Sequence, residues 1–233
     1  MRLAKYLAHS GVASRRRAEE LVRAGRVTVA GDVVEDPARE VADDNAVTVD
    51  GRPVAPEPRE VWAVNKPFGV TSTAREPGRR RAVVELVKSP RRLYPVGRLD
   101  ADSTGLILLT NDGELANRLI HPRYEVPRTY RVRLRRRPSD GELARLRHGV
   151  DLDDGPTAPA RVREVAPRVI ELTLREGRNR QIRRMASAIG NEVVALERIR
   201  FASVRLRDLP LGEARRLRPA EVRRLWKDAE ADE

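Results

Sequence analysis

Cysteine is absent from the 233-residue sequence, aromatic residues make up only 3% of it, and no long apolar run occurs. Without cysteine the chain forms neither a disulfide nor a thiolate metal site. No apolar stretch approaches the roughly 20 residues that a membrane-spanning helix needs. The start of the sequence, MRLAKYLAHSGVASRRR, lacks the apolar core and cleavage site of a signal peptide. These absences disfavour an integral membrane protein and predict a cytoplasmic one.

Basic residues outnumber acidic ones, with 47 lysines and arginines against 35 aspartates and glutamates, a formal charge of +12 and a pI near 11.0. Such a charge favours a polyanionic partner, for which RNA, DNA and an anionic membrane all qualify. Arginine supplies 43 of the 47 basic residues, and its guanidinium group binds phosphate bidentately and stacks on bases. Codon bias in a GC-rich genome would enrich arginine as well, so the arginine count by itself does not decide the partner.

Residues 1–50 have the pattern of a compact unit. Leu3, Tyr6 and Leu7 recur at helical spacing in RLAKYLAHSG. A second helix is predicted in SRRRAEELVRAG, with Ser14 as its N-cap and a glycine at its end. The following stretch, RVTVAGDVV, predicts a strand, a short turn and a second strand.

Charge is divided sharply within this unit. Residues 2–26 hold seven basic and two acidic side chains, whereas residues 27–50 hold one basic and seven acidic ones. The start of the second helix adds backbone N–H donors and the positive end of the helix dipole, which suits a phosphate. A solvated charged helix is the simpler alternative. The predicted RNA-binding residues of this unit are Arg2, Lys5, Arg15, Arg16, Arg17 and Arg26.

The stretch RLAKYLAHSGVASRRRAEELVRAGRVTVAG resembles a small RNA-binding module that occurs in a ribosomal small-subunit protein, in some tyrosyl-tRNA synthetases and in several RNA-modifying enzymes. The resemblance covers the first 50 residues or so. It implies binding to structured RNA and implies no activity.

The rest of the chain predicts a larger domain after a proline-rich linker at residues 51–60. In residues 61–226 strand-like stretches outnumber helices and the connections are short. This pattern predicts an α+β protein, in which a helical RNA-binding domain precedes a mixed, mostly antiparallel β-sheet with packed helices. The acidic end, residues 227–233, is predicted to be a disordered tail.

Local signals mark two helix starts and one loop in the larger domain. Asn111 is the predicted N-cap of the helix in NDGELANRLI, and a capping box runs from Ser139 to Glu142. An arginine-rich loop at residues 79–81 carries no signature that we can assign.

Asp100 and Asp102 stand in the turn of YPVGRLDADSTG, after a predicted strand. Two carboxylates at this spacing can share one face of a strand and hold a divalent ion. A metal site usually needs further ligands, and none stand out, because the three histidines are widely spaced in the sequence. Asp102 also fits a turn closed by side-chain bonds within Asp-Ser-Thr-Gly. We therefore predict no metal and a structural role for Asp102. If this stretch stood alone, Asp100 would be better explained as a turn aspartate.

Two further segments contain residues with functional chemistry. In REGRNRQIRRM several arginines lie on a turn and at the start of a helix, a density that favours polyanion or carboxylate partners. In RTYRVRL the ring of Tyr130 alternates with basic residues, and a ring in that setting suits an unstacked nucleobase, although ordinary core packing is the alternative. The predicted RNA-binding residues of the larger domain are Arg98, Arg178 and Arg180.

The segments VGRLDADSTGLILLTNDGELANRLIHP, RTYRV and LREGRNRQIRRM together resemble the signature segments of the rRNA pseudouridine synthases. The narrower resemblance is to the branch with an amino-terminal RNA-binding module, and it spans nearly the whole chain in the expected order. DGELANRLIHP and EGRNRQIRRM favour the enzymes that act on large-subunit rRNA, and the small-subunit type stays open.

This resemblance implies isomerisation of uridine to pseudouridine without cofactor or metal. It implies that Asp100 is the essential aspartate, that Tyr130 stacks on the target base, and that Arg183 pairs with the aspartate. Near the ribose an ionised carboxylate can act as nucleophile or as base, and the sequence leaves both routes open. The implied partner is ribosomal RNA or a ribosome assembly intermediate, with no membrane involved, and nothing in the sequence demands more than a monomer. The alternatives are a non-catalytic ribosome-associated RNA-binding factor and a metal-dependent nuclease, for which ligands are lacking.

Overall fold

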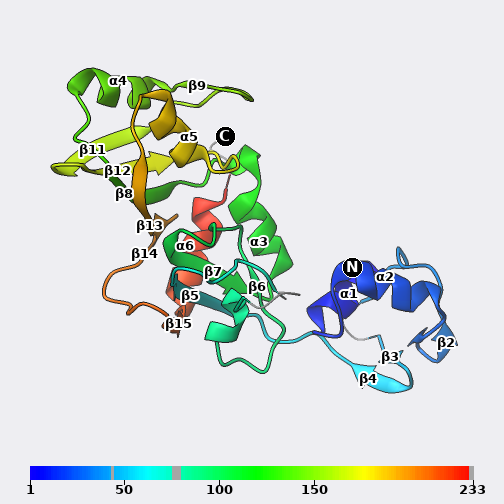
Figure 1. The fold of residues 1–233 in the computed structure, drawn as a ribbon. Helices are drawn as coiled ribbons and strands as arrows, with labels where there is room; N and C mark the ends of the chain where they lie inside the picture. The colour runs from blue at the N-terminus through cyan, green and yellow to red at the C-terminus, as the bar shows by residue number, and fades with distance from the viewer. Residues whose placement is uncertain (43–44, 75–79, 231–233) are drawn as a thin grey trace. The chain divides into compact units, whose positions relative to one another are not determined.

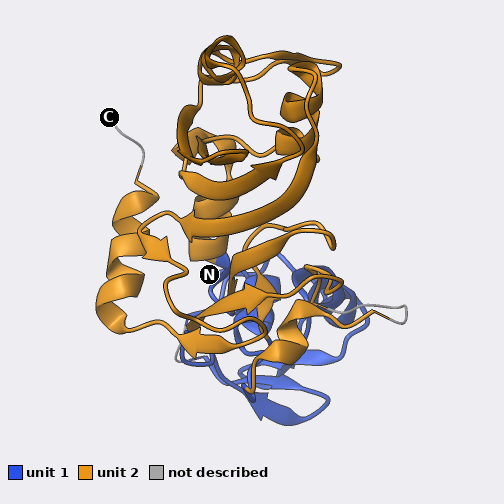
Figure 2. Ribbon diagram, turned by 60° about the vertical axis from the view of Figure 1, so that its left-hand side comes forward, with its two compact units in different colours: residues 1–60, 89–92, 111–113 blue, residues 61–88, 93–110, 114–233 orange. Residues whose placement is uncertain are grey.

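The computed structural model describes residues 1–42, 45–74 and 80–230 of the chain. These residues form two compact units, shown in Figures 1 and 2. The first unit comprises residues 1–60, 89–92 and 111–113, and the second comprises residues 61–88, 93–110 and 114–233. The predicted arginine-rich loop lies partly outside the described residues, since only Arg80 and Arg81 of its three arginines are described.

The first unit contains two short helices and a four-stranded antiparallel sheet with the strand order β2-β1-β3-β4. Ser14 caps the second helix, because its hydroxyl accepts a hydrogen bond from the amide of Arg17 at 3.3 Å. This confirms the predicted N-cap. The elements are α1 (Leu3–His9), α2 (Arg15–Arg23), β1 (Val27–Val29), β2 (Asp32–Val33), β3 (Val47–Val49) and β4 (Arg52–Val54).

The apolar spacing read from the sequence builds the core of this unit. Leu3, Tyr6 and Leu7 are all buried, and they pack with valines of the sheet. The predicted linker is different in the structure. Arg52–Val54 forms strand β4 and pairs with β3, because this stretch directly follows the tight turn at Asp50 and Gly51.

The second unit is built on a nine-stranded sheet that joins two halves (Figure 1). Its order is β11-β12-β8-β13-β7-β5-β15, with β14 paired to β13 and β6 paired to β7. All strand pairs are antiparallel except β13 with β7, so the predicted α+β class with a mostly antiparallel sheet is confirmed. The strands are β5 (Val61–Lys66), β6 (Tyr94–Pro95), β7 (Thr104–Thr110), β8 (Arg128–Leu134), β11 (Arg161–Ala166), β12 (Val169–Leu174), β13 (Val193–Phe201), β14 (Val204–Arg205) and β15 (Ala214–Arg216).

Helices cover both halves of this sheet, and a small separate hairpin stands beside one of them. The capping box of α4 is confirmed, because Ser139 and Glu142 bond each other's backbone amides. The predicted N-cap Asn111 is wrong. Its side chain instead bonds the amide of Glu60 and the carbonyl of Pro58, and the helix begins at Gly113. The elements are η1 (Val83–Leu86), α3 (Gly113–Ile120), η2 (Pro122–Tyr124), α4 (Asp140–His148), β9 (Asp151–Leu152), β10 (Gly155–Pro156), α5 (Gln181–Ala188) and α6 (Pro219–Asp228).

Strand β7 lies in the middle of the core. Its run Leu106–Leu109 is fully buried. Leu106 and Leu108 pack with α3 and α6, whereas Ile107 and Leu109 pack on the other side with residues around η1. This explains why the strand reads as a continuous apolar run rather than an alternating one. Strands β8, β11, β12 and β13 form a second core with α4 and α5.

Gly105 makes the junction between the two halves possible. It has φ +100°, and a Cβ atom at this position would lie 2.4 Å from the carbonyl oxygen and 2.7 Å from the nitrogen of Arg198. Only glycine permits this approach between β7 and β13. The close approach brings the turn before β7 beside the strand that carries Arg198.

The carboxyl-terminal residues differ from the predicted tail. Helix α6 continues to Asp228, whose carboxylate accepts a hydrogen bond from the amide of Ser203 at 2.8 Å, and Ala229 is fully buried. Residues 227–230 are therefore ordered against the domain, and residues 231–233 lie outside the described part of the chain. In that described part no helix is long and apolar enough to span a membrane.

Candidate active site

A cavity of about 420 Å³ opens in the second unit where the two halves of the sheet meet. Its walls come from the turn before β7, from β8, from the turn before α5 and from β13. This volume lies in the range of small-molecule sites, about 300–1,000 Å³, and accommodates a nucleoside. The predicted site residues on its walls are Asp100, Tyr130, Arg98, Arg178, Arg180 and Arg183.

Asp100 is held in place by the backbone on both sides of it. The hydroxyl of Ser72 donates to the carbonyl of Leu99 at 2.7 Å and accepts from the amide of the same residue at 3.0 Å. The amide of Ser103 closes the turn on the carbonyl of Asp100 at 3.0 Å. The carboxylate of Asp100 is 34% exposed and lies 3.8 Å from Nη1 of Arg180. A partly exposed carboxylate thus stands on the cavity wall with a cation beside it.

Asp102 has the closer ion pairs. Its carboxylate lies 3.2 Å from Arg180 and 3.2 Å from Arg183, whose Nη2 also donates to the backbone carbonyl of Asp102 at 3.1 Å. Partial burial acts to raise the pKa of Asp102, but the hydrogen bond from Arg180 and the charge of Arg183 outweigh it and hold this pKa below its usual value. Asp102 does bond within its turn, to Ser103 at 3.4 Å. Its role is wider than the predicted local one, since it joins this turn to α5.

The predicted pairing of Arg183 with Asp100 is not what the structure contains. Arg183 binds Asp102 and donates through Nη1 to the carbonyl of Val193 at 3.2 Å, while the ion pair of Asp100 is with Arg180. Asp102 lies on the same turn as Asp100 and binds Arg183 through both its carboxylate and its carbonyl. The Nε of Arg183 is buried and has no hydrogen-bond partner.

Tyr130 lies in the middle of β8, with its half-buried ring on the cavity wall. The strand register places it opposite Leu172 on one side and Arg198 on the other. The guanidinium of Arg198 lies 6.0 Å from the ring centroid. The ring also packs against apolar residues of two core clusters. Tyr130 therefore combines core packing with a place on the cavity wall.

Three cationic side chains in or near the cavity wall were not singled out by the sequence analysis; two of them are buried and Arg128 is half-buried. Arg198 is 2% exposed and donates through Nε to the carbonyl of Leu106 at 2.6 Å, while its Nη2 has no partner. Arg128 donates to the carbonyl of Leu119 at 2.9 Å, and burial lowers its pKa. Arg198 could have been found from the alternation of β13, because it shares the buried positions of that strand with Leu196.

Lys66 is the third of these cations, and its side chain is fully buried. Its Nζ donates to the carbonyls of Val70 at 2.9 Å and Pro67 at 3.1 Å. Burial lowers the pKa of Lys66 to about 8; Asp102 and Asp100 oppose this shift, and Arg198 adds to it.

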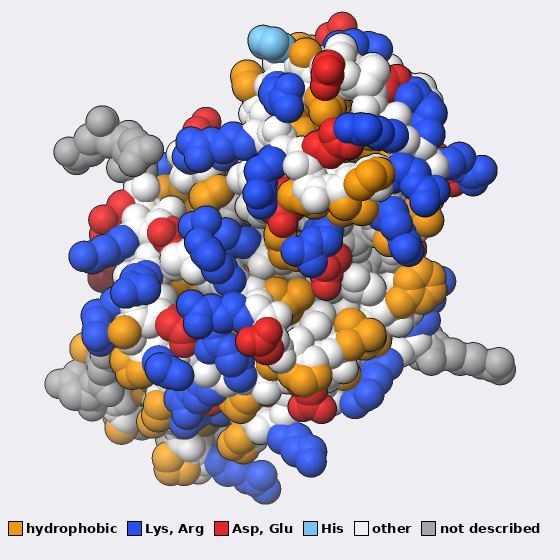
Figure 3. Space-filling model, turned by 90° about the vertical axis from the view of Figure 1, so that its left-hand side faces the viewer, with side chains coloured by type: hydrophobic (Ala, Val, Ile, Leu, Met, Phe, Trp, Pro, Cys, Tyr) orange, Lys and Arg blue, Asp and Glu red, His pale blue; other side chains and the backbone are white. Residues whose placement is uncertain are grey.

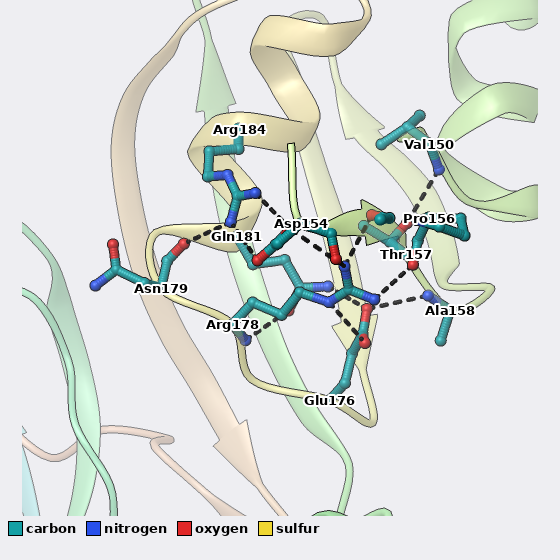
Figure 4. A network of polar contacts seen from close by, with 11 residues as sticks. Val150, Asp154, Pro156, Thr157, Ala158, Glu176, Arg178, Asn179, Gln181 and Arg184 are labelled. Carbon is teal, nitrogen blue, oxygen red and sulfur yellow. Dashed lines mark hydrogen bonds and ion pairs between the residues drawn. The ribbon is translucent and has the colours of Figure 1, made fainter. Parts of the chain in front are cut away.

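A network beside the cavity ties the turn before α5 to the β9–β10 hairpin (Figure 4). Arg178 donates to the carbonyls of Gly155 at 2.8 Å and Pro156 at 2.5 Å, and to the carboxylates of Asp154 and Glu176. Arg184 also pairs with Asp154, and its hydrogen bond is the main cause that lowers the pKa of that carboxyl to about 2. Arg178 was predicted to bind RNA, but its donors point into the hairpin, so the geometry favours a structural role.

Arg180 benefits from this network. It is the N-cap of α5 and has φ +47°, a left-handed conformation that costs a residue with a side chain on the order of 1–2 kcal/mol. The neighbouring bonds hold it there: the amide of Arg178 donates to Gln181 at 3.1 Å, and Arg184 donates to the carbonyl of Asn179 at 3.3 Å. The strained turn directs the 46% exposed side chain of Arg180 to the two aspartates.

The predicted RNA-binding residues of the first unit are distributed unevenly. Arg15, Arg16 and Arg17 are exposed at the start of α2. Arg15 lies 3.9 Å from Glu19, and Arg17 pairs with Glu20. Arg26 bonds Asp50 through Nε at 2.8 Å, and that bond raises its pKa. Arg2 is exposed, and Lys5 is half-buried on α1.

Figure 3 shows one face of the whole molecule. On this face lysine and arginine side chains occupy much of the surface, with acidic side chains between them.

No group of three or more histidine or acidic side chains comes together as a metal site in the described residues. Asp100 and Asp102 instead share the guanidinium of Arg180. The arrangement thus offers a carboxylate, an aromatic ring and several guanidinium groups around a nucleoside-sized space.

Comparison with known proteins agrees with this site. A family model described as RNA pseudouridylate synthase matches residues 60–188, and one described as S4 domain matches residues 1–45. The chain is 45% identical over 231 residues to the ribosomal large subunit pseudouridine synthase B of Bacillus subtilis, covering 96% of this chain and 95% of that protein. It is 39% identical to the dual-specificity RNA pseudouridine synthase RluF of Salmonella typhi, covering 97% of this chain and 78% of that protein.

Among solved structures, a pseudouridylate synthase matches with a TM-score of 0.71 and 29% identity, covering 97% of this chain and 99% of that one. Fold and site together define an RNA-modifying isomerase with an appended RNA-binding domain. The chain belongs to the RNA pseudouridylate synthase family, and its amino-terminal domain is an S4 domain. The family resemblance predicted from the signature segments is confirmed.

Proposed function

We propose that this protein converts a specific uridine of ribosomal RNA, in the large subunit, to pseudouridine, with Asp100 as the reacting carboxylate. The observation that carries the proposal is the cavity whose wall holds both Asp100 and Tyr130, with arginines around them. The 45% identity to a large-subunit synthase of Bacillus subtilis supports the choice of substrate.

The reaction breaks the bond between C1′ of the ribose and N1 of uracil, turns the base and joins C1′ to C5. The hydrogen on C5 then leaves as a proton, and N1 gains one. Asp100 is the carboxylate on the cavity wall that is free enough to reach the sugar, since the bonds that hold it are made by its backbone. Attack on C1′ and removal of a proton from the sugar both require its charged form.

Arg180 and Arg183 keep the charge of this wall balanced. Arg180 lies near both aspartates, and Arg183 is anchored to Asp102 and Val193. Their guanidinium groups favour the ionised form of Asp102 and provide donors for the displaced base. We assign Arg183 a positioning role through Asp102 in the free enzyme.

Tyr130 provides the surface on which the target base stacks. A uridine inside a folded RNA must be flipped out to reach the cavity, at a cost of a few kcal/mol. Stacking on an aromatic ring returns about 1–3 kcal/mol per base. The place of Tyr130 on the cavity wall and its packing against the core support this role, because a fixed ring loses little entropy on binding.

We assign RNA recognition to residues 1–50 and catalysis to residues 61–226, in a monomer that acts in the cytoplasm on rRNA or an assembly intermediate. The S4 domain and the exposed arginines at the start of α2 support the first assignment. Arg98 is exposed at the cavity wall and suits a phosphate close to the target. Binding through such contacts should weaken steeply as salt rises. The reaction as proposed uses no cofactor.

The test is release of tritium from rRNA labelled at uracil C5, with wild type compared to Asp100→Asn. We expect release by wild type on large-subunit RNA and none by the variant, while RNA affinity stays within about threefold, since one carboxylate contributes little to phosphate binding. Release on small-subunit RNA alone would contradict the substrate. Absence of release on both RNAs and on assembly intermediates would favour a non-catalytic binding factor.

A further inference from the structure

Phe68 is the most exposed large apolar side chain among the described residues, at 71% exposure. The other phenylalanine of the chain, Phe201, is fully buried in the core. A ring that remains in water adds nothing to the packing of the fold. Single exposed apolar residues are common on protein surfaces, so the surroundings of Phe68 decide whether it has a function.

The turn that carries Phe68 is fixed by hydrogen bonds from a buried lysine. The buried ammonium of Lys66 binds the carbonyls of Pro67 and Val70, one on each side of Phe68 in the sequence. The backbone of the turn therefore has little freedom, and Phe68 occupies a defined place. A buried cation is a costly support for a turn, which argues that the position of this turn matters.

The same turn is bonded to the turn that carries Asp100. The amide of Gly69 donates to the carbonyl of Ala101 at 2.8 Å. Phe68 directly precedes the donor of this hydrogen bond, and Asp100 directly precedes its acceptor. The side chain of Phe68 does not line the cavity. Its turn is bonded to the turn that carries Asp100 on the cavity wall, so a nucleotide next to one bound at Asp100 would come close to it.

Two exposed arginines follow this turn in the sequence. The amide of Thr71 donates to the carbonyl of Arg81 at 3.0 Å, and the amide of Val83 returns a bond to Thr71 at 2.9 Å. These two bonds hold residue 71 beside residues 81–83. Arg80 and Arg81 are exposed there, with 58% of the Arg81 side chain accessible. Arg81 donates to the carbonyl of Glu85 at 3.2 Å and lies 3.9 Å from its carboxylate, and a phosphate would compete with this exposed pair. An aromatic ring and two guanidinium groups therefore share one segment.

We propose that Phe68, Arg80 and Arg81 form a subsite for the nucleotide next to the flipped uridine. The ring of Phe68 stacks on the neighbouring base, and the arginines bind the adjoining phosphates. Single-stranded RNA is recognised by this combination of aromatic and cationic side chains, and stacking tolerates any base. The subsite therefore contributes affinity rather than sequence choice. The inference rests on the proposed function, because it needs a flipped nucleotide at Asp100.

The test compares Phe68→Ala, Phe68→Leu and Phe68→Trp with wild type, and uses Val165→Ala as a control on an exposed residue of the edge strand β11. Binding of the large-subunit RNA and the single-turnover rate at saturating RNA are measured. We expect Phe68→Ala and Phe68→Leu to raise the Kd about tenfold and Phe68→Trp to restore it. The rate at saturation should stay within twofold of wild type for all four, because none of them touches the reacting atoms.

The salt dependence of binding separates the two parts of the subsite. Arg80→Ala and Arg81→Ala should each reduce the slope of log K against log salt by about 1, and Phe68→Ala should leave it unchanged. Wild-type affinity in Phe68→Ala, or in Phe68→Leu, would overturn the stacking proposal. A wild-type dimer that Phe68→Ala converts to monomer in light scattering would overturn it in favour of an interface between copies. If wild type releases no tritium, the proposed function fails and the subsite as stated fails with it, whereas the binding comparison still shows whether Phe68 contacts RNA.

Discussion

Arg183 holds Asp102 at two points: its Nη2 donates to the backbone carbonyl at 3.1 Å and lies 3.2 Å from the carboxylate. Arg180 adds a second cation to the same carboxylate at 3.2 Å. RNA phosphates would compete for both arginines. By pairing with both guanidinium groups, Asp102 holds them at the cavity wall and so opposes their binding to RNA phosphates.

Asp102→Asn should therefore separate turnover from binding. Loss of a charge-assisted contact of about 1.5–3 kcal/mol predicts a turnover about 10- to 100-fold lower. RNA affinity should stay the same or improve, because a negative charge is removed from the site. Single-turnover kinetics and RNA binding check this, with Asp153→Asn as a control that makes the same charge change on the exposed hairpin. A parallel loss of affinity would show that Asp102 only supports the fold.

Tyr130 offers a prediction about its ring. Tyr130→Phe keeps the stacking surface, and Tyr130→Leu keeps an apolar side chain without a ring. We expect the leucine variant to lower kcat/KM about 10- to 100-fold, as loss of a base stack predicts, and the phenylalanine variant to lose much less. Tritium release under subsaturating RNA measures both. Equal losses in the two variants would assign the effect to the hydroxyl group and contradict stacking.

Asp154 joins the β9–β10 hairpin to Arg178 and Arg184, and so supports the strained turn at Arg180. Asp154→Asn removes the charge from both contacts. We expect the amides of residues 176–181 to exchange faster with solvent and turnover to fall about fivefold, because displacement of a positioning group of this kind is felt in the rate. RNA affinity should be unaffected.

Hydrogen exchange and single-turnover rates test this, and Asp153→Asn is again the matched control because it lies next to Asp154 and is exposed. Unchanged exchange at residues 176–181 in Asp154→Asn would mean that the hairpin does not hold the turn.

Lys66 predicts a pH dependence of stability. Its pKa of about 8 in the folded protein lies below its ordinary value of 10.5, chiefly because burial disfavours the charged form. Between these two values the unfolded chain binds more protons at this group than the folded one, so the free energy of unfolding rises with pH in that window. Lys66→Met removes the group. The stability of wild type relative to Lys66→Met should therefore increase between pH 8 and pH 10.

Urea denaturation of both proteins across this pH range provides the measurement. A difference in unfolding free energy that stays constant with pH would show that Lys66 titrates at its ordinary pKa. A difference that shrinks would reverse the sign of the predicted linkage.

The sequence by itself determined the local structure and the family. The caps at Ser14 and Ser139 and the apolar spacing of α1 depend on neighbours within a few residues, so their prediction was confirmed. The signature segments around Asp100, Tyr130 and Arg183 predicted the family for a related reason, because each is a continuous stretch of chain.

Only the tertiary structure decided which of these groups meet. Asn111 bonds the backbone of residues 58–60 instead of capping the helix. Arg178, which stays a predicted RNA contact, donates to the β9–β10 hairpin, a partner that the sequence did not indicate. Arg183 pairs with Asp102 and not with Asp100. This follows from the tertiary structure, because the close approach of β7 and β13 at Gly105 fixes the position of the aspartate turn relative to α5. Such partners lie up to 92 residues apart in the chain, as for Arg198 and Leu106, and an arginine carries no local mark of the carboxylate or carbonyl that packing brings to it.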